Sequence, residues 1–288
     1  MRFAAFAART ILPGLAVMTL ASEQAPEGEF KNNTCLECHH KQDPDLVAAW
    51  QASTHAATEP MATCTACHGN WHKEAASHAR RDAVCIGCHG GRKNPVVHSY
   101  TTSKHGTIMQ LEQDDWDWSH PLESANYRAP GCAYCHMHKG DHNVSASVRA
   151  WNPMVETDTT ELERVQDLMR AVCQDCHSPR YVTLLFENGE RMLNIGRMKV
   201  REAAGVLEQA GSQYGEAELA AANIQFTKMQ SLHLRNVYLG VGHQSPDYQW
   251  WHGQPALDGD LLRIKAAVGN LHRIRPGATV ITGVTHEP

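Results

Sequence analysis

All ten cysteines of this 288-residue chain occur in five copies of one short pattern, Cys-x-x-Cys-His. The copies are Cys35–His39 (motif 1), Cys64–His68 (motif 2), Cys85–His89 (motif 3), Cys132–His136 (motif 4) and Cys173–His177 (motif 5). Two cysteines separated by two residues bring both sulfurs to one edge of a porphyrin, and the following histidine can bind its iron. The pattern therefore predicts five covalently bound haem c groups.

The predicted haem-binding residues follow directly from this pattern. The thioether-forming residues are Cys35, Cys38, Cys64, Cys67, Cys85, Cys88, Cys132, Cys135, Cys173 and Cys176. The proximal iron ligands are His39, His68, His89, His136 and His177.

Other uses of paired cysteines fit the sequence less well. A disulfide framework does not require a histidine after every second cysteine. Zinc ribbons combine two Cys-x-x-Cys pairs into one tetrahedron, so five pairs leave one unmatched. Ferredoxin clusters need a third nearby cysteine, which is absent. Five histidines would fall in these positions by chance about once in a million, which favours the haem interpretation.

The composition agrees with a haem protein and excludes one class of partner. The chain has 19 histidines, 7% aromatic residues and a formal net charge of −5. A mildly acidic chain lacks the basic surface of a nucleic-acid-binding protein. Its mean hydropathy of −0.44 indicates few apolar side chains for a large core. We expect the haem macrocycles to fill part of the interior.

The first 25 residues resemble a secretory signal peptide. Arg2 and Arg9 precede the apolar stretch Ile11–Leu20. Small residues follow that stretch at Ala21–Ala25. An amphipathic helix of the mature protein is the alternative. No later segment is apolar enough to cross a membrane. We therefore expect a periplasmic or extracellular protein without a membrane span in its mature chain.

Residues 26–178 contain every motif, whereas residues 179–288 contain no cysteine. We expect a mainly α fold with much irregular, haem-supported backbone and a C-terminal helical bundle, packed as one domain with the haem region. The predicted helices cover 43–55, 159–171, two or three long segments after 180, a segment through 232–243 that breaks at its glycines, and 261–270. Residues 114–118 are expected to form an exposed loop.

Fourteen histidines remain after the motif histidines, and up to five are expected to bind the second face of an iron. Each could instead be an ordinary surface side chain. Local context favours His55, His72, His105, His142 and His243, with His78, His98, His120 and His233 in reserve. His72 lies too close to motif 2 to cap the same iron, and His142 is expected to bind the iron of a haem other than its neighbour. His138 is expected at the surface.

The arrangement of motifs over residues 85–255 resembles the C-terminal half of octahaem hydroxylamine oxidoreductases, whose superfamily includes pentahaem nitrite reductases. The resemblance rests on motif 3 followed by Gly-Gly, Ser103–Gly106, Tyr127–Met137, Asp141–Ser145, Cys173–Arg180 and Gly242–Pro246. Trp50–His55 and Cys64–His72 resemble that family's N-terminal haem region.

The resemblance implies redox chemistry but leaves two functions open. The segment holding the family's catalytic haem has no counterpart here, and no motif ends in lysine as in nitrite reductases. A family tyrosine near Tyr238 cross-links a neighbouring subunit's catalytic haem, but packing is the favoured role here. We favour electron transfer between redox partner proteins through bis-histidine haems. The alternative is oxidation or reduction of a small nitrogen compound at a five-coordinate haem. The C-terminal helices are expected to offer a homo-oligomer interface.

Overall fold

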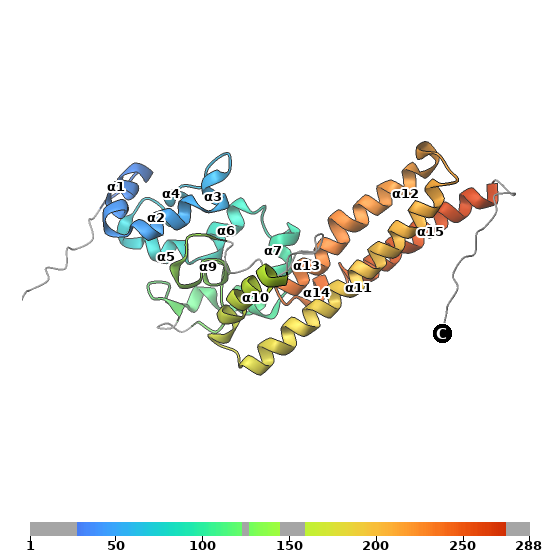
Figure 1. Cartoon of the computed structure of the whole chain (residues 1–288). Helices are drawn as coiled ribbons and strands as arrows, with labels where there is room; N and C mark the ends of the chain where they lie inside the picture. Colours follow the sequence, from blue (N-terminus) through green and yellow to red (C-terminus); the bar gives the residue numbers. More distant parts are fainter. Residues whose placement is uncertain (1–27, 123–126, 145–158, 275–288) are drawn as a thin grey trace, which may run out of the picture.

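The computed structural model describes residues 28–122, 127–144 and 159–274, most of them in helices. Short helices that carry the five motifs gather at one end of the molecule, and three long helices extend away from them (Figure 1). The described ranges contain no β-strand, only an isolated antiparallel bridge between Glu29 and Trp71. The predicted mainly α fold is confirmed. The predicted signal peptide, residues 1–25, lies outside the described residues.

The motif-bearing part consists of short helices joined by turns. Its elements are α1 (Asn32–Gln42), α2 (Pro44–Gln51), α3 (Thr54–Ala57), α4 (Cys64–His68), η1 (His72–Glu74), α5 (Ala75–Ala79), α6 (Asp82–Cys88), α7 (Pro95–Thr101), α8 (Lys104–Glu112), η2 (Gln113–Asp115), α9 (Cys132–His136), η4 (His138–Gly140) and α10 (Thr159–Gln174). Isolated helices shorter than about 12 residues are marginal in water. All but α10 therefore depend on tertiary contacts.

The start of α2 follows from its first residues. The Asp43 carboxylate accepts a hydrogen bond from the Leu46 amide at 3.2 Å, and Pro44 occupies the first turn, where its missing N–H costs nothing. The predicted continuation to His55 is wrong. The chain leaves the helix at Ser53, whose hydroxyl donates to the Trp50 carbonyl at 2.6 Å, and α3 begins at Thr54.

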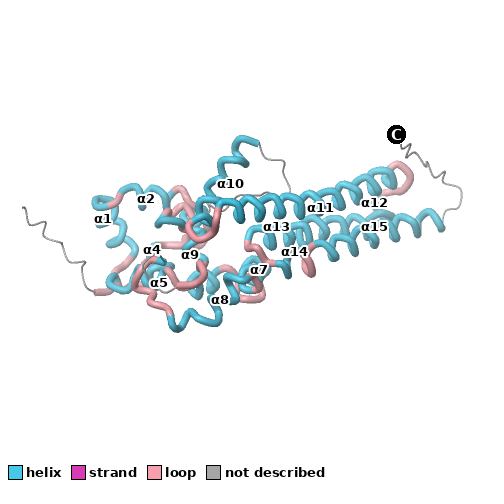
Figure 2. Tube along the Cα trace, turned by 90° about the horizontal axis from the view of Figure 1, so that it is seen from below, coloured by secondary structure: helices cyan, strands magenta, loops and turns pink. Residues whose placement is uncertain are grey.

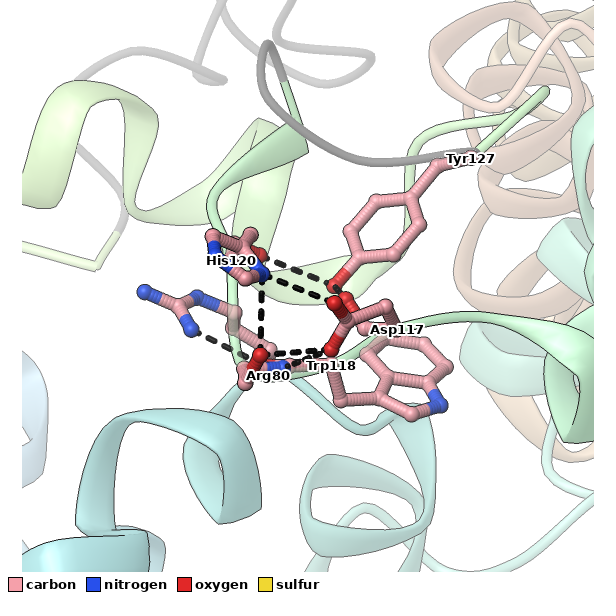
Figure 3. Close-up of polar contacts among 6 residues, drawn as sticks. Arg80, Asp117, Trp118, His120 and Tyr127 are labelled. Atoms are coloured by element: carbon pink, nitrogen blue, oxygen red, sulfur yellow. Dashed lines mark hydrogen bonds and ion pairs between the residues drawn. The ribbon is translucent and has the colours of Figure 1, made fainter.

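The segment 114–118 is only partly the exposed loop that its acidic residues predict. Trp116 and Trp118 are buried, with 7% and 6% exposure, and both rings pack against Tyr127. Arg80 donates to the Trp118 carbonyl at 2.9 Å, and the Tyr127 hydroxyl donates to the Asp117 carbonyl at 2.8 Å (Figure 3). Acidic and tryptophan residues alternate along this segment, so Asp115 and Asp117 are exposed while Trp116 and Trp118 are buried. The segment therefore contributes two indole rings to a buried aromatic cluster.

The second part is built from long helices. They are α11 (Pro179–Gly211), α12 (Glu216–Lys228), a π-helical turn η5 (Met229–Leu234), α13 (Arg235–Gly242), α14 (Pro246–Gln249) and α15 (Gln254–Ile274). Helix α15 packs against both α11 and α12, and the three run side by side (Figure 2). No helix in the described part of the chain is long and apolar enough to cross a membrane.

The core of the long helices is made of side chains at helical spacing. Val182, Phe186 and Leu193 of α11 pack with Leu257 and Ile264 of α15. Tyr238 packs against the same cluster, in agreement with the favoured packing role. A Cβ at Gly196 would lie 2.9 Å from Leu234, so this glycine permits close approach of α11 to the η5 turn.

The predicted C-terminal helices are present, but one is longer than expected. Helix α13 ends at Gly242, as the glycines predict, and α10 begins at Thr159 as predicted. The segment predicted as 261–270 is instead the 21-residue α15. Its first turn has no acidic residue, and the predicted start overlooked Pro255, a residue that suits the first turn of a helix.

We expect Leu193→Ala to destabilise the long-helix bundle strongly. Leu193 has 0% exposure, and its truncation leaves a cavity that typically costs about 2–5 kcal/mol. Guanidinium chloride unfolding followed by far-ultraviolet circular dichroism measures the change. Leu184→Ala on the same helix is the matched control, because Leu184 is 49% exposed and its loss should change the free energy of unfolding by less than about 1 kcal/mol. Equal effects of both variants would contradict the packing described.

Candidate haem sites

Each Cys-x-x-Cys-His motif lies on one helical turn. Motifs 2 and 4 are the short helices α4 and α9, motif 1 lies within α1, and motif 3 ends α6. Motif 5 begins in the last turn of α10. None of the ten cysteines is paired in a disulfide. The helical turn places the two sulfurs of each motif on one side, as thioether attachment to one porphyrin requires.

The cysteines of successive motifs lie close together. Several of them therefore shift the pKa of a cysteine in the neighbouring motif. Burial raises the pKa of Cys64, and the nearby Cys35 raises it further. Burial likewise raises the pKa of Cys67, with Cys85 of motif 3 adding to the rise. Motif 2 therefore has motif 1 and motif 3 as neighbours.

The same order continues to the end of the series. A hydrogen bond to Cys85 raises the pKa of Cys132, so motif 3 touches motif 4. Burial raises the pKa of Cys135 to about 12, and Cys173 of motif 5 adds to the rise. The five motifs thus follow one another in space in the same order as in the sequence.

Every motif histidine faces a second histidine from a different segment of the chain. The pairs, with the separations of their ring centres, are His39–His72 at 6.4 Å, His68–His142 at 6.0 Å, His89–His55 at 6.1 Å, His136–His243 at 6.5 Å and His177–His105 at 5.9 Å. The five partners are the five histidines that local sequence context favoured. None of the reserve histidines forms such a pair with a motif histidine among the described contacts.

These separations fit two imidazoles on opposite faces of one iron. A histidine nitrogen lies about 2.0 Å from a bound metal ion, so two rings across the ion have centres roughly 6 Å apart. The donor set, two imidazoles for each pair of cysteines, is that of a bis-histidine haem c. The residues present therefore fit haem.

Burial keeps these imidazoles in the neutral form that binds metal. It lowers the pKa of His243 to about 4, with the neighbouring His136 lowering it further. Burial is also the main cause of the lowered pKa of His136 itself. The pKa values of His55, His68 and His105 are lowered for the same main reason. Neutral imidazole is the ligand form, so deprotonation before binding costs little.

Hydrogen bonds at Nδ1 orient several of these rings. The Ala75 carbonyl lies 3.1 Å from His68 Nδ1, and the Gly140 carbonyl lies 2.7 Å from His142 Nδ1. Ser99 Oγ lies 2.7 Å from His243 Nδ1. Each contact leaves Nε2 free for the iron and fixes the plane of the ring, as second-layer partners of metal-binding histidines do.

The expectation that His138 lies at the surface is wrong. Its side chain is 12% exposed, and Nε2 contacts the Asp175 carboxylate at 2.6 Å. Tyr134 donates to the same carboxylate at 2.7 Å. Tyr134 lies between the cysteines of motif 4 and Asp175 between those of motif 5, so this group joins two motifs. The contact spans 37 residues of sequence, which local context does not reveal.

A second acid, Asp82, also joins neighbouring motifs, and unlike Asp175 it is buried; sequence reasoning missed it. Asp82, 3% exposed, begins α6 and accepts a hydrogen bond from the Cys132 amide at 2.7 Å. Burial raises the pKa of Asp82, and this hydrogen bond opposes the rise. The carboxylate thereby ties motif 3 to the start of motif 4. A single aspartate before a motif carries no sequence signal for this role.

Helical Cys-x-x-Cys-His turns, each with a second imidazole facing the motif histidine, define a multihaem c-type cytochrome. Residues 51–220 match the family described as "Seven times multi-haem cytochrome CxxCH", and the chain belongs to this family. The matched region contains motifs 2 to 5. Covalently bound haem c is therefore the cofactor of this protein.

One curated relative is described as an oxidoreductase fusion. A "Probable nitrite reductase-hydroxylamine oxidoreductase fusion protein" of Kuenenia stuttgartiensis is 21% identical over 370 residues, covering 86% of this chain and 43% of the relative. The chain thus spans less than half the length of that relative.

Two solved structures share the fold. A chain of the "reducing HAO-like protein complex" of Kuenenia stuttgartiensis aligns with a TM-score of 0.55 and 15% identity, covering 84% of this chain and 85% of that one. A "Hypothetical multiheme protein" aligns with a TM-score of 0.59 and 17% identity, covering 74% and 59%. The relation to hydroxylamine oxidoreductases predicted from the motifs is confirmed.

Proposed function

We propose that this protein is an exported electron-transfer cytochrome with five haem c groups, each bound by two histidines. The single observation that carries the proposal is the one-to-one pairing of the five motif histidines with five others at 5.9–6.5 Å. Each pair would occupy both axial positions of one iron. No face is then left for a substrate.

The residues of the chain would hold the cofactors in a continuous series. Haem c supplies a reversible one-electron couple whose potential depends on axial ligands, burial and nearby hydrogen bonds. The thiols attach the porphyrins in the order of motifs 1 to 5, and Asp82 and Asp175 hold neighbouring motifs together. Buried neutral imidazoles would change little between the two oxidation states. Such an arrangement suits transfer between two redox partner proteins.

Export and assembly belong to the same proposal. Covalent attachment of haem c takes place outside the energised membrane, and residues 1–25 have the composition of a signal peptide. We propose a periplasmic or extracellular location on this basis. Exposed apolar side chains on the long helices support a homo-oligomer interface there: Ile195, Met198, Ile224 and Leu262.

Spectroscopy of the purified protein tests the ligand assignment. We expect a pyridine haemochrome assay to give five haems per chain and electron paramagnetic resonance of the oxidised protein to show only low-spin iron. Two imidazoles per iron impose the low-spin state. A high-spin signal with the intensity of one haem, lost when hydroxylamine or cyanide is added, would contradict the proposal. That result would instead support an oxidoreductase acting on a small nitrogen compound.

A further inference from the structure

A pocket of about 600 Å³ lies between α7 and the segment from η5 to α15, and three histidines line it. They are His98 of α7, His233 of the η5 turn and His252, which follows α14. None of the three faces a motif histidine among the described ring contacts, so the haem assignment leaves them unused. Tyr248 and Trp251 also line the pocket.

Two of these histidines and one carboxylate converge at this pocket. One ligand atom each from His98, Asp247 and His252 lies within 4.8 Å of the other two. His252 Nε2 is 3.5 Å from Asp247 Oδ2, and the His98 and His252 rings have centres 6.1 Å apart at 79°. Among the described residues, this is the group that brings together three side chains of ligand type in this way.

We infer that His98, Asp247 and His252 bind a divalent transition-metal ion of the zinc class. Imidazole nitrogen and carboxylate oxygen are both usual zinc ligands, at about 2.0–2.2 Å, and two histidines with one carboxylate form a known three-ligand set. Closing the ligand atoms around an ion needs shifts of about an ångström. His252 is 48% exposed on its side chain, so its ring has room to make that shift.

The surroundings orient the ligands as they do in metal sites. His98 Nδ1 lies 3.2 Å from the Tyr248 hydroxyl, so with Nδ1 protonated and donating, Nε2 is free for the ion. Asn236 donates to the His252 carbonyl at 3.0 Å and fixes the backbone of that ligand. His233, on the pocket wall, is held through Nδ1 by the fully buried Asp260, and its Nε2 is free for a further contact.

Two other histidine–aspartate contacts show what distinguishes this group. His120 contacts Asp117 at 2.8 Å on the surface, and His138 contacts Asp175 at 2.6 Å (Figure 3 shows the former). Each of these involves one imidazole and is closed by hydroxyl donors: Ser119 for Asp117 and Tyr134 for Asp175. The pocket group has a second imidazole facing the first.

The ion would connect the two parts of the molecule. His98 belongs to α7 of the motif-bearing part, whereas Asp247 and His252 belong to the C-terminal helices. Ser99, adjacent to His98, contacts His243 at 2.7 Å. Metal binding would therefore clamp α7 against the α14 segment next to that contact.

Zinc binding to the intact, tag-free holoprotein tests the inference. After removal of metal ions with a chelator and exchange into clean buffer, we expect isothermal titration calorimetry with ZnCl₂ to show one saturable site per chain. His252→Ala and Asp247→Asn should each weaken that site at least about tenfold, because each removes a direct ligand. Metal analysis after gel filtration gives an independent count.

His120→Ala is the matched control, since it removes an exposed histidine beside a carboxylate without changing the pocket. It should leave the zinc affinity unchanged. Unaltered Soret and far-ultraviolet spectra establish that each variant is folded and retains its haems. Absence of a saturable site, or equal zinc affinity in the wild type, His252→Ala and His120→Ala proteins, would overturn the inference and leave the haem assignment intact.

Discussion

Replacing His243 with alanine is expected to convert one of the five low-spin irons to the high-spin state. His243 is the only histidine among the described ring contacts that faces His136, so its loss leaves one face of that iron without a protein ligand. His243 is half-buried, and this burial lowers its pKa to about 4. Electron paramagnetic resonance and cyanide binding, each at one equivalent per chain, measure the change.

External imidazole should restore the low-spin spectrum of the His243→Ala protein, because it can occupy the vacated position. His40→Ala is the control: His40 is exposed and adjacent to motif 1, and its loss should leave all irons low-spin. If His243→Ala retained a fully low-spin spectrum, the pairing of His136 with His243 would be wrong.

Removing both thiols of motif 4 is expected to prevent accumulation of folded protein, whereas removing those of motif 1 is not. Motif 4 lies in the interior of the series, and burial raises the pKa of Cys135 to about 12. Loss of its haem would leave a large apolar void between the two parts of the molecule. By contrast, Cys38 of motif 1 is exposed, whereas both cysteines of motif 4 are half-buried.

The comparison uses Cys132→Ala/Cys135→Ala and Cys35→Ala/Cys38→Ala proteins expressed under the same conditions. We expect a normal yield with one haem fewer per chain for the motif 1 variant, and a yield at least about tenfold lower for the motif 4 variant. Haem content per mole of purified protein and the yield of soluble chain measure both effects. Similar yields would show that the position in the series does not determine the contribution to stability.

The attachment sites could be predicted from the sequence because their chemistry is local. Two sulfurs and one imidazole must lie within five residues to serve one porphyrin, so the motif itself contains the geometry. The five histidines that face motif histidines are also those that local context favoured, such as His105 before Gly106. Their pairing could not be predicted. His55 faces motif 3, for example, although motif 2 is nearer in sequence.

Contacts between distant segments account for the remaining differences. The buried positions of Trp116 and Trp118 depend on Tyr127, which lies beyond the acidic residues that suggested an exposed loop. His138 and Asp82 are held by motifs 37 and 50 residues away. Helix α15 extends beyond its predicted bounds because packing against α11, rather than a cap, sets its start.

The pairing of each motif histidine with a distant partner has a consequence for biogenesis. A chain secreted from its N-terminus presents His55 and His105 before motifs 3 and 5 emerge, so those sites can close at once. The site at His39 can close only after His72 has emerged. The site at His68 can close only after His142 has emerged, beyond motif 4. The site at His136 closes after the longest delay, because its partner His243 lies 107 residues later in the chain. On the proposed export route, we therefore expect this fourth site to be the last to mature.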